Sequence, residues 1–415
     1  MHAVTLAPQD WMQSAPTRRL LAALTAGGAE VRFVGGCVRD ALVDRPVSDI
    51  DLATTEPPER VIERLDAADV HAVPTGVAHG TVTAIVDGRP YEVTTLRRDV
   101  ETFGRHARVA FTDDWQADAA RRDFTMNALS CRPDGTVFDF FGGIADLHGG
   151  RVRFVGDAHR RIAEDVLRLL RFFRFYAWYG RPPPDADGLA ACAEAAPLLA
   201  GLSAERVRRE LLRLLAAPDP MPALRAMAAA GVLDHLLPGP AHLDRVGALV
   251  DLERSQGEAE PIRRVAALID APDAAVALAR RWRFSNAERK RLEGAVSGQG
   301  GAAGKADLGS DRARMRRALY RVGAERYRDL AFLDAAEHPD GHGLLAARLR
   351  EAGRWTRPRL PVDGRDVVTL GVGPGPDIGA LLAALESWWL DHDFQPDRRA
   401  CLERLHAIVD GRDAG

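Results

Sequence analysis

The sequence of 415 residues predicts an α+β fold, with a small mixed β-sheet in the first 150 residues and only helices after them. Short apolar runs alternate with helical patterns up to about residue 150. Beyond that point helical spacing of Ala, Leu, Arg and Glu dominates. The length exceeds that of a typical single domain, while 46% apolar and 28% charged residues are ordinary for a globular protein. We therefore expect several domains.

Four segments of the first part are predicted to be strands, at residues 31–34, 49–53, 81–86 and 91–95. Asp87-Gly88 joins the last two and is typical of a tight hairpin turn. Helices are expected directly after the glycine pair at 35–36 and over 57–65, where a proline opens the segment.

Helical spacing over residues 158–179, 204–215 and 221–229 indicates the first helices of the second part. Proline-rich segments interrupt the later helices, and we expect boundaries near 150, 215 and 357. The chain would then have four parts, at residues 1–150, 151–215, 216–356 and 357–415.

Composition excludes several classes of protein. A net charge of −3 gives no overall sign of nucleic-acid binding, so any basic surface must be local. The four cysteines show no Cys-x-x-Cys spacing, which argues against a zinc ribbon or a disulfide framework and fits a cytoplasmic location. No signal peptide is apparent and no run reaches the roughly 20 apolar residues of a membrane span. We expect no membrane association, and no protein partner is evident.

The most informative motif places Asp49 and Asp51 downstream of Gly35 and Gly36. In an extended segment alternate side chains leave the same face, so both carboxylates would meet at one point. Such a pair repels unless a cation holds it, and Mg²⁺ suits oxygen ligands of this kind. The glycines let the backbone approach a phosphate, and Arg39 adds a guanidinium for its charge. This combination predicts phosphoryl or nucleotidyl transfer; the alternative is a turn aspartate beside a surface aspartate.

A metal site of this type usually includes a third carboxylate from a neighbouring strand. Glu92 is the best candidate, because Tyr91 and Val93 would face the other way. The alternative is a solvated strand residue.

The second group of candidates lies in residues 121–128. Arg122 offers a donor for phosphate, Asp123 an acceptor for a ribose hydroxyl and Asn127 an adaptable amide. Phe124 and Met126 would anchor the segment in the core. The alternative is the charged start of an ordinary helix.

The third group lies in a predicted helix, where spacing puts Asp165, Arg168 and Arg171 along one stripe. A carboxylate beside a guanidinium is often a plain i,i+3 ion pair. Alternatively, the pair forms a protein template, because cytosine and adenine both present an amino donor next to a ring-nitrogen acceptor. Uracil and guanine would leave donors facing donors, at about 1–3 kcal/mol per lost bond. The apolar residues between are expected in the core: Leu169, Leu170, Phe172, Phe173 and Phe175.

Together these residues resemble the class II tRNA nucleotidyltransferase and poly(A) polymerase family of the polymerase β superfamily, most closely its CCA-adding enzymes. The similar motifs cover residues 35–51, 121–128, 139–150, 164–174 and 204–211. The resemblance implies a polymerase β-like nucleotidyltransferase head at 1–150, a nucleotide-selecting helical neck at 151–215, a helical body at 216–356 and a tRNA-binding helical tail at 357–415.

The resemblance also implies roles for the candidates. Asp49 and Asp51 would hold catalytic Mg²⁺, with Glu92 as the further catalytic carboxylate. The implied nucleotide-binding residues are Gly36, Arg39, Arg122, Asp123, Asn127, Asp165, Arg168, Arg171 and Arg174.

The implied reaction is template-independent CCA addition to the tRNA 3′ end from CTP and ATP, with release of pyrophosphate. Residues 75–82 are similar to the CCA-adding branch, and residues 97–118 resemble the loop that changes addition from C to A. A poly(A) polymerase, an A-only enzyme and a catalytically idle RNA-binding paralogue are the alternatives. A basic run over 312–328 with Tyr320 and Tyr327 would suit RNA backbone contacts or, equally, a solvated helix face.

Overall fold

The structure is a computed structural model that describes residues 4–103, 106–297, 307–338 and 342–411. It divides into two compact units, Met1–Ala241 and His242–Gly415. The finer division into head, neck, body and tail stays a prediction. Among the described helices, none combines the length and the apolar character that crossing a lipid bilayer requires.

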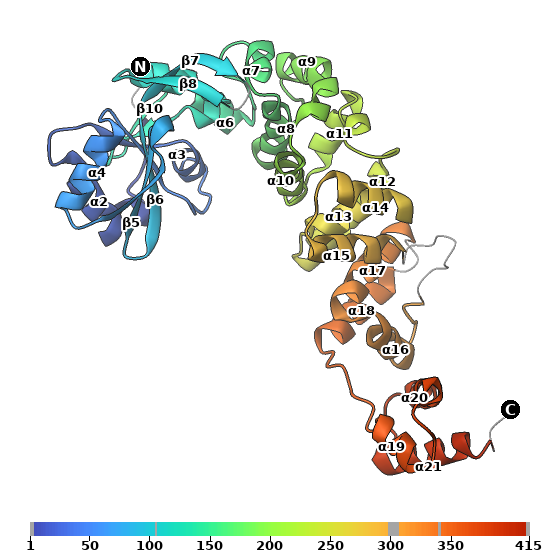
Figure 1. Ribbon diagram of the computed structural model, residues 1–415. Helices are drawn as coiled ribbons and strands as arrows, with labels where there is room; N and C mark the ends of the chain where they lie inside the picture. Colours follow the sequence, from blue (N-terminus) through green and yellow to red (C-terminus); the bar gives the residue numbers. More distant parts are fainter. Residues whose placement is uncertain (1–3, 104–105, 298–306, 339–341, 412–415) are drawn as a thin grey trace. The chain divides into compact units, whose positions relative to one another are not determined.

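An eight-stranded sheet forms the centre of the N-terminal part of the first unit (Figure 1). The order of its strands is β1-β10-β9-β2-β3-β6-β5-β4. Only the β3–β6 pair is parallel among these strands, so the predicted mixed sheet is confirmed. The strands are β1 Val4–Thr5, β2 Val31–Val34, β3 Asp51–Thr54, β4 His71–Gly76, β5 Thr81–Val86, β6 Arg89–Thr95, β9 Ser130–Cys131 and β10 Thr136–Phe138.

Two helices, α2 (Ala15–Thr25) and α4 (Pro58–Ala67), lie side by side against this sheet (Figure 1). Val61 and Leu65 of α4 are four residues apart and both are fully buried, as helical periodicity requires of a helix with one apolar face. The remaining elements of this region are α1 Asp10–Gln13, α3 Gly36–Ala41, α5 Trp115–Ala120, α6 Gly143–Gly149 and the two-stranded pair β7 Arg97–Phe103 with β8 His106–Phe111. Of the predicted loop at 97–118, residues 104–105 lie outside the described residues.

Helices follow in the rest of the first unit, but the single helix expected over 158–179 is wrong. It breaks at Asp165, whose backbone is extended (φ −154°, ψ 107°) and whose Oδ1 accepts the Leu167 N–H at 3.1 Å. An aspartate side chain that caps the following turn competes with continuation of the preceding helix, which explains the break. The helices are α7 Ala158–Glu164, α8 Leu167–Tyr179, α9 Ala186–Ala195, α10 Ala204–Leu215 and α11 Met221–Ala229.

An aromatic cluster joins α8 to the segment that carries Asp123. The rings of Phe172 and Phe154 stack with centroids 5.7 Å apart, and Phe124 contacts both of them. The expected burial of Phe124 and Met126 is confirmed. So is that of the apolar residues of α8: Leu169, Leu170, Phe172, Phe173 and Phe175.

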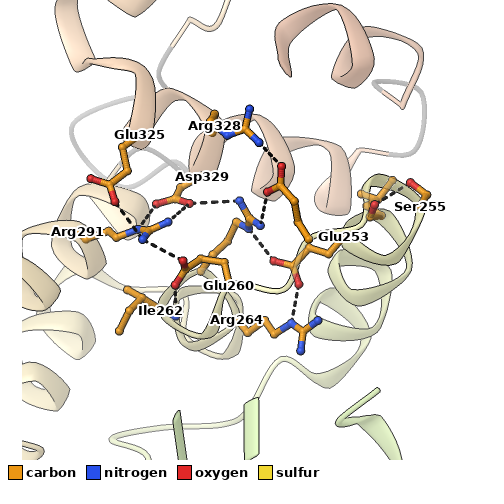
Figure 2. A network of polar contacts seen from close by, with 12 residues as sticks. Glu253, Ser255, Glu260, Ile262, Arg264, Arg291, Glu325, Arg328 and Asp329 are labelled. Carbon is orange, nitrogen blue, oxygen red and sulfur yellow. Dashed lines mark hydrogen bonds and ion pairs between the residues drawn. The ribbon is translucent and has the colours of Figure 1, made fainter. Parts of the chain in front are cut away.

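The second unit is helical throughout its described residues. Buried ion pairs connect its first helices: Glu253 of α12 accepts from Arg263 at 2.7 Å and from Arg264, both on α13 (Figure 2). Asp329 of α17 accepts from Arg291 of α15 at 2.7 Å. The helices are α12 Leu243–Gln256, α13 Pro261–Leu268, α14 Pro272–Arg281, α15 Asn286–Ser297, α16 Arg312–Val322, α17 Ala324–Glu337, α18 His342–Gly353, α19 Gly364–Thr369, α20 Pro376–Asp391 and α21 Arg398–Val409.

The basic run over 312–328 is less exposed than its sequence suggests. Tyr320 and Tyr327 are buried, so neither ring is available to stack on a base. Arg316 and Arg317 form ion pairs with aspartates of the C-terminal segment. Because these guanidiniums are engaged within the unit, this run is not a simple solvated basic face.

Candidate active site

A cavity of about 670 Å³ in the first unit collects most of the predicted site residues. Its lining includes eight arginines and four carboxylates, which favours a polyanionic ligand. The predicted residues in the lining are Gly36, Arg39, Asp51, Glu92, Arg122, Asp123, Asn127, Asp165, Arg168 and Arg171. Two predicted residues, Asp49 and Arg174, do not line it.

Two carboxylates of the lining face each other from neighbouring strands. Asp51 is the first residue of β3, and its partner in the parallel β3–β6 register is Glu92. Side chains in register on adjacent strands share a face, and adjacent strands lie about 4.8 Å apart. Burial, together with the negative charges of Glu92 and then Asp49, raises the pKa of Asp51 to about 6, although Arg122 opposes the shift.

These carboxylates fit a hard divalent cation, because ionised oxygen donors at mutually repelling distances gain from a shared positive charge. Asp49 lies before β3 rather than within it, is exposed, and accepts a hydrogen bond from the Ser48 hydroxyl at 3.2 Å. Within the described ranges, no three His, Cys, Asp or Glu side chains are already arranged as a ligand set. Asp51 and Glu92 would therefore be the first ligands, and Asp49 would turn toward them.

The glycine pair leaves space for a guanidinium at the cavity. Gly35 precedes α3 with φ +70°, a conformation that favours glycine, and a Cβ built on it would lie 2.9 Å from Nη1 of Arg122. The side chain of Arg122 also donates to the Asn127 carbonyl at 3.3 Å. A side chain at position 35 would therefore strain the backbone and displace the end of the Arg122 side chain.

Arg39 is held rigidly at the cavity wall. Its guanidinium donates to both carboxylate oxygens of Asp40, at 3.0 and 2.9 Å, and to Oδ1 of Asn127 at 2.6 Å. The ring of Tyr179 lies 4.4 Å from the guanidinium carbon. Arg39 thus presents a fixed positive charge rather than a mobile one.

Asp123 is buried but remains an acceptor. Its Oδ1 accepts from the Phe124 N–H and the Asn127 amide, both at 2.9 Å, and its Oδ2 accepts from Arg171 at 2.6 Å. Burial alone would raise the pKa of Asp123, but Arg171 and these donors outweigh it and hold the pKa below its usual range. The carboxylate is therefore ionised at neutral pH and can accept from a hydroxyl.

Asp165 and Arg168 both line the cavity but do not pair with each other's side chain as a plain i,i+3 ion pair would. Asp165 accepts from Arg206 of α10 at 2.7 Å, and Arg168 forms its ion pair with Glu164. The expected single helical stripe is wrong for Asp165, since this residue ends α7 with extended backbone and lies two residues before α8 begins. Each group thus has a partner that orients it, as a fixed base-reading pair requires.

The two remaining predicted arginines, Arg171 and Arg174, differ in their position relative to the cavity. Arg171 of α8 lines the cavity between Asp123 and the buried Glu210 of α10, to which its Nη1 lies 3.9 Å away. Arg174 donates to the same Glu210 at 2.5 Å and stacks on Phe175, outside the cavity lining. A nucleotide contact of Arg174 stays a prediction.

Four arginines of the cavity lining were not among the predicted site residues: Arg97, Arg121, Arg206 and Arg213. Arg206 and Arg213 share one face of α10 with Glu210, at i, i+4 and i+7 spacing. That periodicity was a usable signal in the sequence. For Arg97, at the start of β7, no local pattern points to the site.

Comparison with known proteins matches two family models to this chain. Residues 31–153 match the poly A polymerase head domain, and residues 184–243 match the probable RNA and SrmB-binding site of polymerase A. The CCA tRNA nucleotidyltransferase 1, mitochondrial, of Mus musculus is 36% identical over 91% of this chain and 86% of its own. The CCA-adding enzyme of Lactobacillus delbrueckii subsp. bulgaricus is 32% identical over 88% of this chain and 90% of its own.

The chain is also similar to solved structures of CCA-adding enzymes. The Bacillus stearothermophilus CCA-adding enzyme in complex with CTP has a TM-score of 0.78 and 28% identity, covering 96% of this chain and 99% of that one. The Thermotoga maritima CCA-adding enzyme complexed with tRNA has a TM-score of 0.67 over 98% and 99% of the two chains. At 20% identity the latter speaks for the fold alone.

Proposed function

This chain belongs to the family of CCA tRNA nucleotidyltransferases, and we propose that it adds C, C and A to the 3′ end of tRNA from CTP and ATP. In each addition the RNA 3′-oxygen bonds to the α-phosphorus of the nucleotide and pyrophosphate leaves. One observation supports this most directly: a single arginine-rich cavity is lined by both the Asp51–Glu92 carboxylates and the Asp165 and Arg168 side chains.

Asp51 and Glu92, with Asp49 beside them, would hold Mg²⁺, which when bound lowers the pKa of the RNA 3′-hydroxyl and neutralises charge on the triphosphate. The raised pKa of Asp51 supports this assignment, because burial and then the charge of Glu92 disfavour the ionised carboxylate, and a bound divalent cation would offset both effects. The specific use of Mg²⁺ and the ligand set remain part of the proposal.

The arginines of the cavity would bind the triphosphate and the carboxylate of Asp123 the ribose. Arg122 has a fixed position beside Gly35, so its side chain loses little conformational entropy when a phosphate binds. Asp123 is ionised and lies in the lining, where it can accept from a ribose hydroxyl.

Asp165 and Arg168 would select the base without a nucleic-acid template. An ionised carboxylate accepts from the amino group of cytosine or adenine, and a guanidinium donates to the adjacent ring nitrogen. Arg206 and Glu164 would hold these two groups in place. The CTP complex of the Bacillus stearothermophilus enzyme, which is similar over nearly the whole chain, supports CTP as one substrate.

The test uses tRNAs that end before CCA, after C and after CC, each incubated with Mg²⁺ and labelled CTP or ATP. Products are resolved at single-nucleotide length. We expect all three to grow to CCA and then stop, and a matched Asp51→Ala protein to add nothing while remaining folded. Extension of the CC-ended tRNA alone would indicate an A-only enzyme, and an open-ended A ladder a poly(A) polymerase. Binding of tRNA without any turnover would indicate an idle paralogue.

We expect the enzyme in the cytoplasm, because its four cysteines are free thiols buried in the described structure, as a reducing compartment allows. The mouse and human relatives are named as mitochondrial proteins.

A further inference from the structure

A buried carboxylate lies behind the arginines of the cavity. Asp118 belongs to α5 and is 4% exposed, and its side chain does not line the cavity itself. A buried acid outside a site needs partners that offset the cost of burying its charge. In this case the partners belong to three residues that do line the cavity.

The contacts of Asp118 connect two parts of the cavity wall. Its carboxylate accepts from Nε of Arg121 at 2.8 Å and from Nη2 of Arg122 at 3.4 Å. Its Oδ1 also accepts the backbone N–H of Arg97 at 3.3 Å, where β7 begins. One carboxylate thus holds two guanidiniums and the first residue of the β7–β8 pair.

The electrostatics keep this carboxylate charged. Burial alone would raise the pKa of Asp118, but Arg121 and Arg122 outweigh it and lower the pKa. Arginine side chains lose rotamer freedom when they bind an anion, and a fixed carboxylate removes part of that loss in advance.

We propose that Asp118 is a positioning residue for the triphosphate, which holds Arg121 and Arg122 at the cavity and ties the start of β7 to the same point. This inference rests on the proposed function. The triphosphate is common to CTP and ATP, so loss of Asp118 would weaken the binding of both nucleotides to the same extent. The binding of a nucleoside monophosphate would change little. If Asp118 acted only through its charge, its removal would lessen repulsion of the triphosphate and tighten anion binding. Loss of positioning predicts weaker anion binding instead.

The test measures dissociation constants of the full-length protein, with Mg²⁺ and without tRNA, for CTP, ATP, CMP and inorganic tripolyphosphate. We expect Asp118→Asn to weaken CTP, ATP and tripolyphosphate about tenfold each and CMP less than about twofold. Asp114→Asn is the matched control. It removes a carboxylate from the start of the same helix, where Asp114 is exposed and accepts from the Gln116 and Ala117 N–H groups. We expect it to leave all four constants unchanged.

Asp118→Glu keeps the charge and restores part of the tripolyphosphate affinity; it also serves as the test if Asp118→Asn does not fold, as judged by thermal unfolding. Equal weakening of CTP and CMP in the folded variant would show a structural role instead and overturn the proposal. Unchanged or tighter tripolyphosphate binding would overturn it too. Failure of the proposed function would be seen separately, as a wild-type protein that binds tripolyphosphate and adds no nucleotide.

Discussion

The side chain of Asp51 is less stable in its ionised form than an exposed aspartate would be. Burial contributes most to this, and the negative charge of Glu92 on the neighbouring strand adds to it. A protein that only needed a stable sheet would place apolar or neutral residues there. The arrangement therefore supports the proposal that these carboxylates bind a cation.

Removal of this charge should stabilise the metal-free protein. The pKa of Asp51 is about 6 in the folded state, above its ordinary value of 3.8, so the folded state binds the proton more tightly. Stability then falls as pH rises from about 4 to 6 and stays reduced above that window. We expect Asp51→Asn to raise the free energy of unfolding at pH 7.5 in EDTA by about 1–3 kcal/mol.

Urea denaturation of the wild-type and Asp51→Asn proteins from pH 4 to 7.5 checks this prediction. The gain from the substitution should shrink toward pH 4. Asp49→Asn is the control, since Asp49 is exposed and its removal should change stability by less than about 0.5 kcal/mol. An equal gain at pH 4 and pH 7.5 would contradict the assigned pKa.

Base selection provides a second prediction at this scale. Arg168→Ala should lower the preference for CTP over UTP, measured as the ratio of kcat/KM values, by about 10- to 100-fold, because a hydrogen bond that discriminates donors from acceptors is lost. Arg160→Ala is the matched control: Arg160 also pairs with Glu164, at 3.4 Å, but is largely exposed and outside the cavity lining. An unchanged CTP preference in Arg168→Ala would exclude the template role.

Helix α8 shows how one element serves both the core and the site. Arg168 and Arg171 are three residues apart and reach the cavity, while the two leucines between them and the rings of Phe172 and Phe173 pack inward. Phe172 lies at the centre of this packing, stacked on Phe154 and in contact with Phe124. The ring cluster therefore sets the position of α8 against the segment that begins with Asp123.

Truncation of this ring should destabilise the first unit. Phe172 is fully buried, and Phe172→Ala should lower the free energy of unfolding by about 3–5 kcal/mol through lost burial and a cavity. Nucleotide affinity should fall with it, because α8 loses its support. Thermal and urea unfolding measure the first effect. Leu198→Ala is the control: its side chain is 56% exposed, so the substitution should change stability by less than about 0.5 kcal/mol. A similarly small effect of Phe172→Ala would contradict the prediction and show that neighbouring side chains fill the space left by the ring.

At the scale of the whole molecule, both units have an apolar core. The second unit adds to its core a network of buried charges between its helices (Figure 2). Glu253 is fully buried and shared by two buried arginines of α13. Buried charges cost much to desolvate, so such a network is stable only while its members stay complementary.

Neutralising Glu253 should therefore destabilise the second unit selectively. We expect Glu253→Gln to cost about 3–5 kcal/mol, since it leaves excess positive charge in a buried region. Calorimetry should show an earlier unfolding transition, with the nucleotide-binding cavity of the first unit still able to bind CTP. Glu325→Gln is the control, because Glu325 is 72% exposed and pairs with Arg291 at the surface. A cost below about 1 kcal/mol for Glu253→Gln would contradict this view of the network.

Local pattern in the sequence was enough for many of the elements and for naming half of the residues that line the cavity. Short strand-like runs predicted β2 and β5 with the bounds they have, and they predicted β6, which pairs with β5 across the expected hairpin turn, to within two residues. The sequence records such strands directly, because β2 is a mostly apolar run that is buried at every position and β5 is buried at every second position. The identities of these cavity residues followed from motifs, because each motif lies within one short segment.

Only the tertiary structure decided which side chains meet. The register that sets Asp51 opposite Glu92 and the pairing of Asp165 with Arg206 both join residues about 40 apart in the sequence. The break at Asp165 also depended on a tertiary choice of partner, because the Asp165 side chain accepts the Leu167 N–H at the start of the next helix. Such choices result from the packing of the whole core, which selects one register and one set of partners among many that local sequence allows equally.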